Sequence, residues 1–195
     1  EYSMSFDGND DYVDLQSAGL SNNPSNLTET AWIKYTGNNA NWGIVLTKRN
    51  SNSQSWATLG TQHGKGMFAR DAMNCSNTIT GTSVDDNSWH HIAGVIDGNI
   101  YRLYIDGYFV DSIIANCSNP GSSSNMILGN HPEWSNGSGL SSWFKGLIDE
   151  VQIWNTALTQ QEIQQYMNCP PTGNEAGLVG YWNFEEGSGT TALDL

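Results

Sequence analysis

The sequence predicts an all-β fold, an antiparallel sandwich of two sheets with one short helix near its C-terminal end. Three observations predict it. Apolar and polar residues alternate with a period of two in many short segments, which is typical of strands with one buried face. Gly, Asn and Ser crowd the segments between them, as is usual for turns. Only one stretch, near residue 160, has helical spacing, so strands do not alternate with helices as in a parallel sheet.

The expected strands follow one another at short intervals, and turn clusters separate them. Residues 7–10 form a turn between the first two strands, and Asp97-Gly98-Asn99 closes a hairpin. Asp106-Gly107 turns the chain again directly afterwards. In chain order, strands are expected at residues 3–6, 12–15, 30–35, 43–47, 55–59, 66–70, 89–96, 100–105, 108–112, 125–129 and 144–154.

One segment has the signals of an amphipathic helix. Thr159 is a suitable N-cap, and Glu162 three residues later completes a capping box, in which each side chain bonds to the other's backbone N–H. The apolar residues of the segment fall on one face. Cys169 and the two prolines that follow it end the helical pattern. We therefore expect one short helix near residues 159–167.

Composition excludes several classes of partner. The 195 residues include 20 acidic and 7 basic side chains, which gives a formal net charge of −13. This charge repels phosphate backbones and anionic membrane surfaces, so nucleic acid is not an expected partner. No apolar run reaches the roughly 18 residues that membrane insertion requires. The length suits a single domain over residues 1–195, and 21 aromatic residues supply enough apolar surface for a folded core.

The three cysteines point to an oxidising compartment. No C-x-x-C pair exists, which excludes a zinc knuckle and a thioredoxin-type motif. Cys75 and Cys117 each lie in the same tetrapeptide, Asn-Cys-Ser-Asn. We expect a disulfide between them, with two reduced structural thiols as the alternative. Cys169 is left over, either free or paired outside this segment.

Five segments in order along the chain resemble the laminin-G-like, or concanavalin A-like, jelly-roll family in its bacterial and pentraxin-related branch. Each alone is a weak signal, whereas five in the expected order are specific and cover most of the chain. They are the opening signature at residues 5–15, a strand at 31–34, the two halves of a hairpin at 89–95 and 103–107, and a closing strand and helix at 146–155, 157–159 and 162–163. The resemblance implies a jelly-roll sandwich.

The last segment departs from the usual layout of that family. Residues 177–191 resemble the strand that normally begins such a domain, yet here they end the chain. Residues 176–195 are therefore either the first strand of a following repeat or a permuted edge strand of this domain. We favour the permuted strand, because a solitary strand with Leu178, Trp182 and Phe184 exposed would not order itself.

The resemblance also implies a structural calcium ion that bridges the opening turn to the closing strand. Carboxylates and backbone carbonyls in turns supply the oxygen ligands that calcium prefers. Asp149 alternates with Val151 and Ile153, so its carboxylate is expected on their buried face, where it needs a partner or a metal. Alternatively, Asp149 accepts backbone N–H groups and no metal binds. The predicted ligands are Asp7, Gly8, Asn9 and Asp149.

Catalysis is not expected. Retaining glycosidases need two carboxylates about 5–5.5 Å apart across the scissile bond. The glycosidases of the resembled family carry a Glu-x-Asp-x-Glu or Glu-x-Asp-x-x-Glu run, and this sequence has none. Asp149 and Glu150 are adjacent and point to opposite faces of a strand. His90 and His91 lie within a strand, which favours neutral, hydrogen-bonded imidazoles.

Tryptophans outside the expected strands are the candidate ligand contacts. Aromatic rings pack against the C–H faces of sugars, and amides and carboxylates bond to their hydroxyls. Four tryptophans in family strands are expected to pack in the core: Trp32, Trp89, Trp154 and Trp182. The candidate site contains residues from polar segments: Trp42, Trp134, Trp143, His131, Glu133 and Asn136. Alternatively, these tryptophans plug the ends of the sandwich.

Together these observations predict a non-catalytic recognition module, secreted or at the cell surface, that belongs to a larger multidomain protein. The expected partner is a polysaccharide or a cell-surface glycan. A structural or protein-binding adhesin repeat without sugar affinity is the first alternative. A glycan-degrading enzyme domain is the second.

Overall fold

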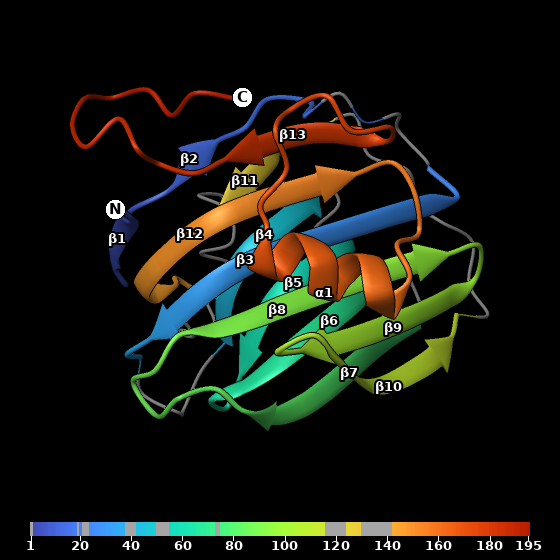
Figure 1. Ribbon diagram of the computed structural model, residues 1–195. Helices are drawn as coiled ribbons and strands as arrows, with labels where there is room; N and C mark the ends of the chain where they lie inside the picture. Colours follow the sequence, from blue (N-terminus) through green and yellow to red (C-terminus); the bar gives the residue numbers. More distant parts are fainter. Residues whose placement is uncertain are drawn as a thin grey trace.

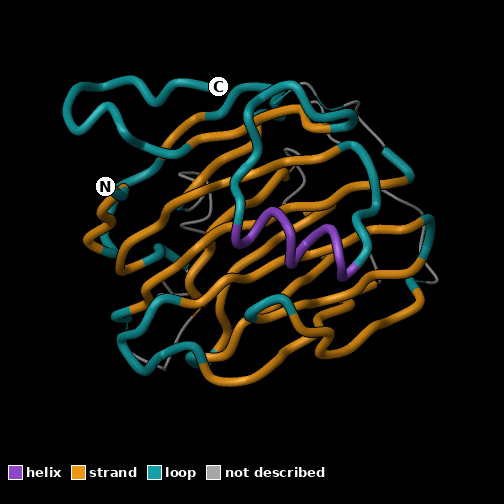
Figure 2. Tube along the Cα trace, in the orientation of Figure 1, coloured by secondary structure: helices purple, strands orange, loops and turns teal. Residues whose placement is uncertain are grey.

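Two antiparallel sheets lie face to face, and one helix crosses the outer surface of the larger sheet (Figure 1). The computed structural model describes residues 2–18, 20, 24–37, 42–49, 55–72, 75–115, 124–129 and 142–195, apart from the side chains of residues 49, 55, 56, 71, 72, 75 and 76. Strands dominate the regular structure, with loops joining them at both ends of the sandwich (Figure 2). The predicted two-sheet sandwich with one helix is confirmed.

The larger sheet has seven strands, in the order β1-β12-β3-β8-β9-β10, and β13 also pairs with β12. Its strands are β1 (Met4–Asp7), β3 (Asn26–Tyr35), β8 (His90–Asp97), β9 (Ile100–Ile105), β10 (Tyr108–Ile114), β12 (Lys145–Trp154) and β13 (Leu178–Trp182).

The smaller sheet has six strands, in the order β2-β11-β4-β5-β6-β7. The alternation of apolar residues does not predict β7, in which Ile79 is the only large aliphatic residue. Its position explains this composition, because β7 is the edge strand beyond β6 and buries little of its length. The six strands are β2 (Val13–Asp14), β4 (Trp42–Arg49), β5 (Ser55–Gln62), β6 (Lys65–Ala72), β7 (Cys75–Ser83) and β11 (Met126–Leu128).

Apolar side chains from both inner faces fill the space between the sheets. On β3, Leu27, Ala31 and Ile33 are fully buried and alternate with residues of the outer face. Leu46 of β4 and Phe68 of β6 belong to the same cluster on the opposing sheet. Burial of these faces stabilises the sandwich and fixes the register of its strands.

Three charged side chains lie within this core. Glu29 of β3, Lys48 of β4 and Arg70 of β6 are 0%, 1% and 3% exposed. No described residue donates a hydrogen bond to either carboxylate oxygen of Glu29. Burial raises the pKa of Glu29 to about 8, although the positive charge of Lys48 opposes the shift. Burial lowers the pKa of Lys48, and the charge of Glu29 opposes that shift in turn.

The strand β12 carries β1 and β13 end to end along one edge. β1 pairs with residues 145–148 and β13 with residues 151–154, while β3 pairs along the other edge. Between these two ladders the register with β3 shifts, and Glu150 has a φ of +50°. This irregularity is a β-bulge, in which one extra residue interrupts the alternation of side chains.

The bulge places Asp149 on the outer face of the sheet. Ile148 and Val151 both belong to the core with two residues between them, so Asp149 does not share the face of Val151. The prediction of a core-facing Asp149 is therefore wrong, because it assumes an unbroken period of two. The Asp149 carboxylate accepts the Glu150 N–H at 2.8 Å, and the Glu150 carboxylate accepts the Tyr181 hydroxyl at 2.6 Å. Burial and this contact raise the pKa of Tyr181.

The helix α1 (Gln160–Asn168) lies on the outer face of the seven-stranded sheet (Figure 1). Thr159 Oγ1 accepts the Glu162 N–H at 3.3 Å, and the Glu162 carboxylate accepts the Thr159 N–H at 2.8 Å. The predicted capping box is thus confirmed. Trp154 of β12 packs under the helix, with its ring centre 4.5 Å from that of Tyr166.

Candidate functional site

A groove opens between the N-terminal segment and the chain that follows β13. Residues 2–4 and 12–18 line one side, and residues 182, 184, 186–192 and 194 line the other. In Figure 1 the segment after β13 runs beside β1 and β2, so the two ends of the sequence meet here. The groove has a volume of about 800 Å³, within the usual range of about 300–1,000 Å³ for ligand sites.

A tight turn after β2 forms the N-terminal wall of the groove. The Asp14 carboxylate accepts the Gln16 N–H at 2.8 Å and the side-chain amide of Asn125 at 2.9 Å. Gln16 and Ala18 have left-handed backbones, with φ of +58° and +47°. The Met126 N–H of β11 donates to the Gln16 carbonyl at 2.7 Å. These bonds attach the wall to the six-stranded sheet.

Two carboxylates hold the C-terminal wall. Glu186 accepts the Leu193 N–H at 2.6 Å, and Asp194 accepts the Tyr181 N–H at 2.8 Å. The Leu195 N–H donates to the Tyr181 carbonyl at 3.0 Å, so the end of the chain lies along β13. This segment has no regular secondary structure, and these three bonds give it a defined path.

Aromatic residues form the floor and the rim of the groove. Trp182 and Phe184 on the floor are each 4% exposed, whereas Tyr2 and Tyr12 at the rim are 57% and 48% exposed. The Tyr2 ring lies so close to Gly187 that a Cβ there would be 3.0 Å from it. Aromatic rings can pack against the C–H faces of a sugar, and carboxylates and hydroxyls can bond its hydroxyl groups. The groove offers both kinds of contact.

An acidic turn lies directly after β1. One carboxylate oxygen from each of Asp7, Asp10 and Asp11 lies within 4.8 Å of the others, and all three residues are exposed. Asp7 accepts the backbone and side-chain N–H groups of Asn9 at 2.8 and 3.0 Å. These hydrogen bonds lower the pKa of Asp7, with burial opposing them weakly. Gly8 lies within the same turn with a φ of +84°.

The structure does not bring Asp149 to this turn. The β1–β12 ladder sets Asp7 level with Lys145, four residues before Asp149. Four residues of a strand span about 13 Å, whereas calcium holds its oxygen ligands at about 2.3–2.6 Å. One ion therefore cannot bridge Asp7 and Asp149, and the expected ligand set is corrected to the turn alone. Asp149 instead accepts a backbone N–H, as its alternative interpretation predicts.

The predicted ligand-binding tryptophans are only partly described. Trp42 is the first residue of β4, half-buried, and packs against Ile44, Met67 and Ala69. It is therefore not the exposed loop residue that its polar sequence neighbourhood predicts. Trp143 is half-buried next to the start of β12. The other four candidates lie outside the described residues: Trp134, His131, Glu133 and Asn136.

The tryptophans predicted to pack in the core divide into two groups. Trp154 and Trp182 are 1% and 4% exposed, which confirms their predicted role. Trp32 is half-buried on the outer face and meets the His91 ring edge-on, with ring centres 5.5 Å apart. Trp89 precedes β8 and is 38% exposed, so the prediction of core packing is wrong for this residue.

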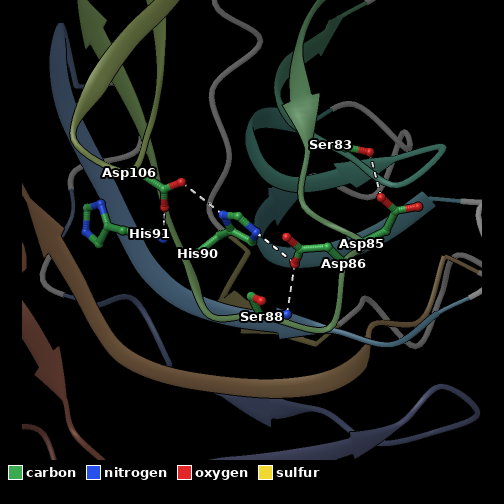
Figure 3. A network of polar contacts seen from close by, with 7 residues as sticks. All are labelled: Ser83, Asp85, Asp86, Ser88, His90, His91 and Asp106. Carbon is green, nitrogen blue, oxygen red and sulfur yellow. Dashed lines mark hydrogen bonds and ion pairs between the residues drawn. The ribbon is translucent and has the colours of Figure 1, made fainter.

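His90 lies between two aspartates at one end of the seven-stranded sheet (Figure 3). Its Nδ1 is 2.9 Å from Asp106 and its Nε2 is 3.1 Å from Asp86. Burial disfavours the imidazolium, but the hydrogen bonds and charges of the two carboxylates outweigh it and raise the pKa of His90. The predicted hydrogen bonding of His90 is confirmed, and the two carboxylates favour its charged form. Each ring nitrogen faces a carboxylate, so His90 links the loop before β8 to the turn after β9.

His91 lies on the other side of Asp106 in Figure 3. Asp106 accepts the His91 N–H at 3.0 Å, while no described residue bonds to its Nδ1. Burial lowers the pKa of His91 to about 4, so its ring is neutral at pH 7, as predicted. The nearby Ser83 hydroxyl donates to Asp85 at 2.6 Å and does not contact either histidine in this network.

The predicted Cys75–Cys117 disulfide lies outside the described residues, because residue 117 and the side chain of residue 75 are not among them. Cys169 follows the helix, is exposed and carries a free thiol. Among the described helices, none combines the length and apolar character needed to cross a membrane.

The groove is not predicted from the sequence. Tyr2 and Tyr12 flank the acidic opening turn, and the aspartates of that turn indicate metal binding. The Gly-Ser-Gly-Thr-Thr run at 187–191 follows an aromatic strand, and that pairing of small hydroxyl residues with aromatics was the available signal.

Comparison with known proteins shows to which family this chain is similar. A model of the concanavalin A-like lectin/glucanases superfamily matches residues 7–164. A protein of Bacteroides ovatus to which carbohydrate binding is ascribed has a TM-score of 0.74 and 16% identity, over 98% of this chain and 54% of that chain. Domain 4 of an extracellular arabinanase from Geobacillus stearothermophilus, solved with arabinotriose, has a TM-score of 0.63 and 19% identity, over 84% of this chain and 75% of that one.

A curated relative is the "Sushi, von Willebrand factor type A, EGF and pentraxin domain-containing protein 1" of Rattus norvegicus. It is 28% identical over an alignment of 113 residues, and the match covers 54% of this chain and 3% of the rat protein. The two antiparallel sheets and the likeness to the solved structures define a jelly-roll domain. The chain belongs to the concanavalin A-like lectin/glucanases superfamily, which confirms the resemblance seen in the sequence.

Proposed function

We propose that this chain is an extracellular recognition module that binds carbohydrate in the groove between residues 2–18 and 182–194. The observation that carries the proposal is the lining of this groove, which combines exposed tyrosines with carboxylates and small hydroxyl residues. Carbohydrate binding ascribed to the Bacteroides ovatus protein, and arabinotriose in the arabinanase domain, support the ligand class. The rat relative supports a place in a larger multidomain protein.

The module holds its glycan without cleaving it. Glycosidic hydrolysis needs a pair of carboxylates on either side of the scissile bond. In the groove, Glu186 and Asp194 each accept a backbone N–H that holds the wall in place. The acidic pair of β12 is also engaged, since Asp149 accepts a backbone N–H and Glu150 accepts the Tyr181 hydroxyl. These contacts give each of the four acids a structural role, which supports a non-catalytic module.

Replacing Tyr12 with alanine is expected to weaken glycan binding by about tenfold, which corresponds to about 1.4 kcal/mol. The substitution removes an exposed ring at the rim that would pack against a sugar face. Affinity electrophoresis in gels containing arabinan, galactan, xylan or dextran measures the effect.

Tyr108→Ala is the matched control, because Tyr108 is 67% exposed on β10 and does not line the groove. Equal weakening in both variants would move the site away from the groove. If the unmodified protein binds none of these polysaccharides and no glycan on an array, the proposed function is wrong.

A protein-binding repeat is the second candidate function. The outermost strand of the seven-stranded sheet, β10, exposes Tyr108, Phe109 and Ile114 by 67%, 49% and 58%. An apolar edge strand is a common site of protein contact, because it offers both unpaired backbone groups and side chains. Absence of glycan binding together with self-association or partner capture through β10 would favour this candidate.

We also propose that the turn at Asp7, Asp10 and Asp11 holds a structural calcium ion. Three carboxylates whose oxygens lie within 4.8 Å of one another match the hard oxygen ligands that calcium takes. A bound cation would offset the mutual repulsion of these charges and stiffen the turn between β1 and β2. The turn adjoins Tyr12, so its order would also set the position of one groove rim.

Chelation of calcium is expected to lower the melting temperature, because a ligand that binds the folded state stabilises it by mass action. At a free calcium concentration of about a hundred times Kd this stabilisation is about 2.7 kcal/mol. Differential scanning fluorimetry with calcium and with EGTA measures the change. Asp10→Asn should abolish the response, whereas Asp111→Asn, an exposed acid on β10, should keep it. Identical melting curves with calcium and EGTA would contradict the site.

A further inference from the structure

The groove carries acidic groups and no basic ones. Among its lining residues Asp14, Glu186 and Asp194 are acidic, and none is Lys, Arg or His. Asp14 and Asp194 are exposed, and Glu186 is half-buried. The chain as a whole, these residues included, has a formal net charge of −13. An anion entering the groove would therefore meet negative charge without a compensating cation.

Two of these carboxylates, Glu186 and Asp194, each have one oxygen available for a ligand. Glu186 binds the Leu193 N–H through Oε1, and Asp194 binds the Tyr181 N–H through Oδ1. No described residue donates a hydrogen bond to the second oxygen of either group. A carboxylate oxygen accepts hydrogen bonds but cannot donate them when ionised. The hydroxyl groups of a sugar can donate to these oxygens, whereas an ionised carboxylate or sulfate group on the sugar cannot.

The aromatic half of the groove fits the same ligand. Tyr2 and Tyr12 are exposed at the rim, and Trp182 and Phe184 close the floor. Rings pack best against the apolar C–H faces of sugars, and a charged substituent there would lose its hydration without a partner. Both halves of the groove therefore disfavour anionic glycans.

We propose that the groove selects uncharged glycans and excludes those that carry carboxylate or sulfate groups. The selection rests on the proposed carbohydrate binding and specifies its ligand class. Glu186 and Asp194 act as specificity residues, because each can accept a hydrogen bond from a sugar hydroxyl and repels acidic substituents. Asp14, whose two oxygens already accept N–H groups, adds to the repulsion. Coulomb repulsion over a few ångströms survives at physiological salt, where the screening length is about 8 Å.

Matched pairs of polysaccharides test this selection, since the members of each pair share a backbone and differ in charge. The probes are dextran against dextran sulfate and hydroxyethyl cellulose against carboxymethyl cellulose, in 150 mM NaCl, a concentration chosen near physiological ionic strength of about 0.15 M. Biolayer interferometry with the intact chain is expected to give at least tenfold weaker binding to the charged member of any pair whose neutral member binds. Equal or tighter binding of the charged member would overturn the selection and leave carbohydrate binding intact.

A pair of charge-matched variants separates the groove from the overall charge of the protein. Glu186→Gln/Asp194→Asn keeps an acceptor oxygen at each position and removes two negative charges from the groove, so the discrimination is expected to fall by at least threefold. Asp97→Asn/Asp111→Asn removes two charges outside the groove and is expected to leave the discrimination unchanged.

Two other outcomes would contradict the proposal. If both double variants lose the discrimination equally, the net charge of the chain causes it and the groove does not. If no neutral or charged glycan binds, the proposed function itself fails, and the selection fails with it. Circular dichroism of each variant establishes that the fold persists.

Discussion

Replacement of Trp154 by alanine is expected to lower the free energy of unfolding by about 3–5 kcal/mol. Trp154 is 1% exposed and packs between β12 and the helix, with its ring centre 4.5 Å from that of Tyr166. It belongs to a separate apolar cluster that includes Val95 and Ile163 and attaches α1 to the sheet. Its indole N–H also donates to Gln152 at 3.3 Å. Alanine would leave a cavity at the centre of this contact.

Urea denaturation followed by circular dichroism measures this loss. Trp89→Ala removes the same side chain from a position that is 38% exposed and is expected to cost clearly less. If the two variants lose equal stability, the packing of the helix against the sheet does not contribute what its burial implies.

The second large effect concerns the charges buried between the sheets. Lys48→Met is expected to raise the pKa of the fully buried Glu29 further, because it removes the opposing positive charge, and so to cost about 1.4 kcal/mol more at pH 9 than at pH 8. The cost depends on pH. Glu29 has a pKa of about 8 in the folded protein, against an ordinary value of 4.5 for glutamate. Between these pH values the folded state therefore retains a proton that the unfolded state releases.

This difference in bound protons decides whether the free energy of unfolding rises or falls with pH. The contribution of Glu29 is fully present below about pH 4.5 and is lost as the pH rises through about 8. Without Lys48 the pKa of Glu29 rises further, and stability continues to fall above pH 8, by up to about 1.4 kcal/mol per pH unit. Lys48→Met/Glu29→Gln removes the ionisable group and should remove this added slope.

Urea denaturation at pH 6.5, 8 and 9 distinguishes the two variants. Comparing them with each other cancels the titration of His90 and His91, which both retain. Parallel pH profiles for Lys48→Met and for the double variant would show that the titration of Glu29 does not contribute to stability.

Most of the fold could be predicted from the sequence because the strands alternate and the turns have strong local signals. Asp97-Gly98-Asn99 joins β8 to β9 as expected, and the Thr159–Glu162 capping box starts the helix. The prediction failed where tertiary context changes the local rule. The edge strand β7 needs few apolar residues, and the bulge at Glu150 reverses the faces of β12.

The groove could not be predicted in the same way, because it exists only between distant segments. Tyr12 and Trp182 line the same groove, and β1, which precedes Tyr12, and β13, which ends at Trp182, pair with the same strand. Local sequence shows neither pairing. The acidic turn was visible as a cluster of aspartates, but the distance from Asp7 to Asp149 depends on the register of β1 and β12.

The shared edge of β12 also bears on the solubility of the molecule. β1 covers one half of this edge and β13 covers the other half. An uncovered half would present unpaired backbone N–H and C=O groups, to which a strand of another molecule could bind. By covering both halves, β1 and β13 together prevent intermolecular strand pairing at this edge.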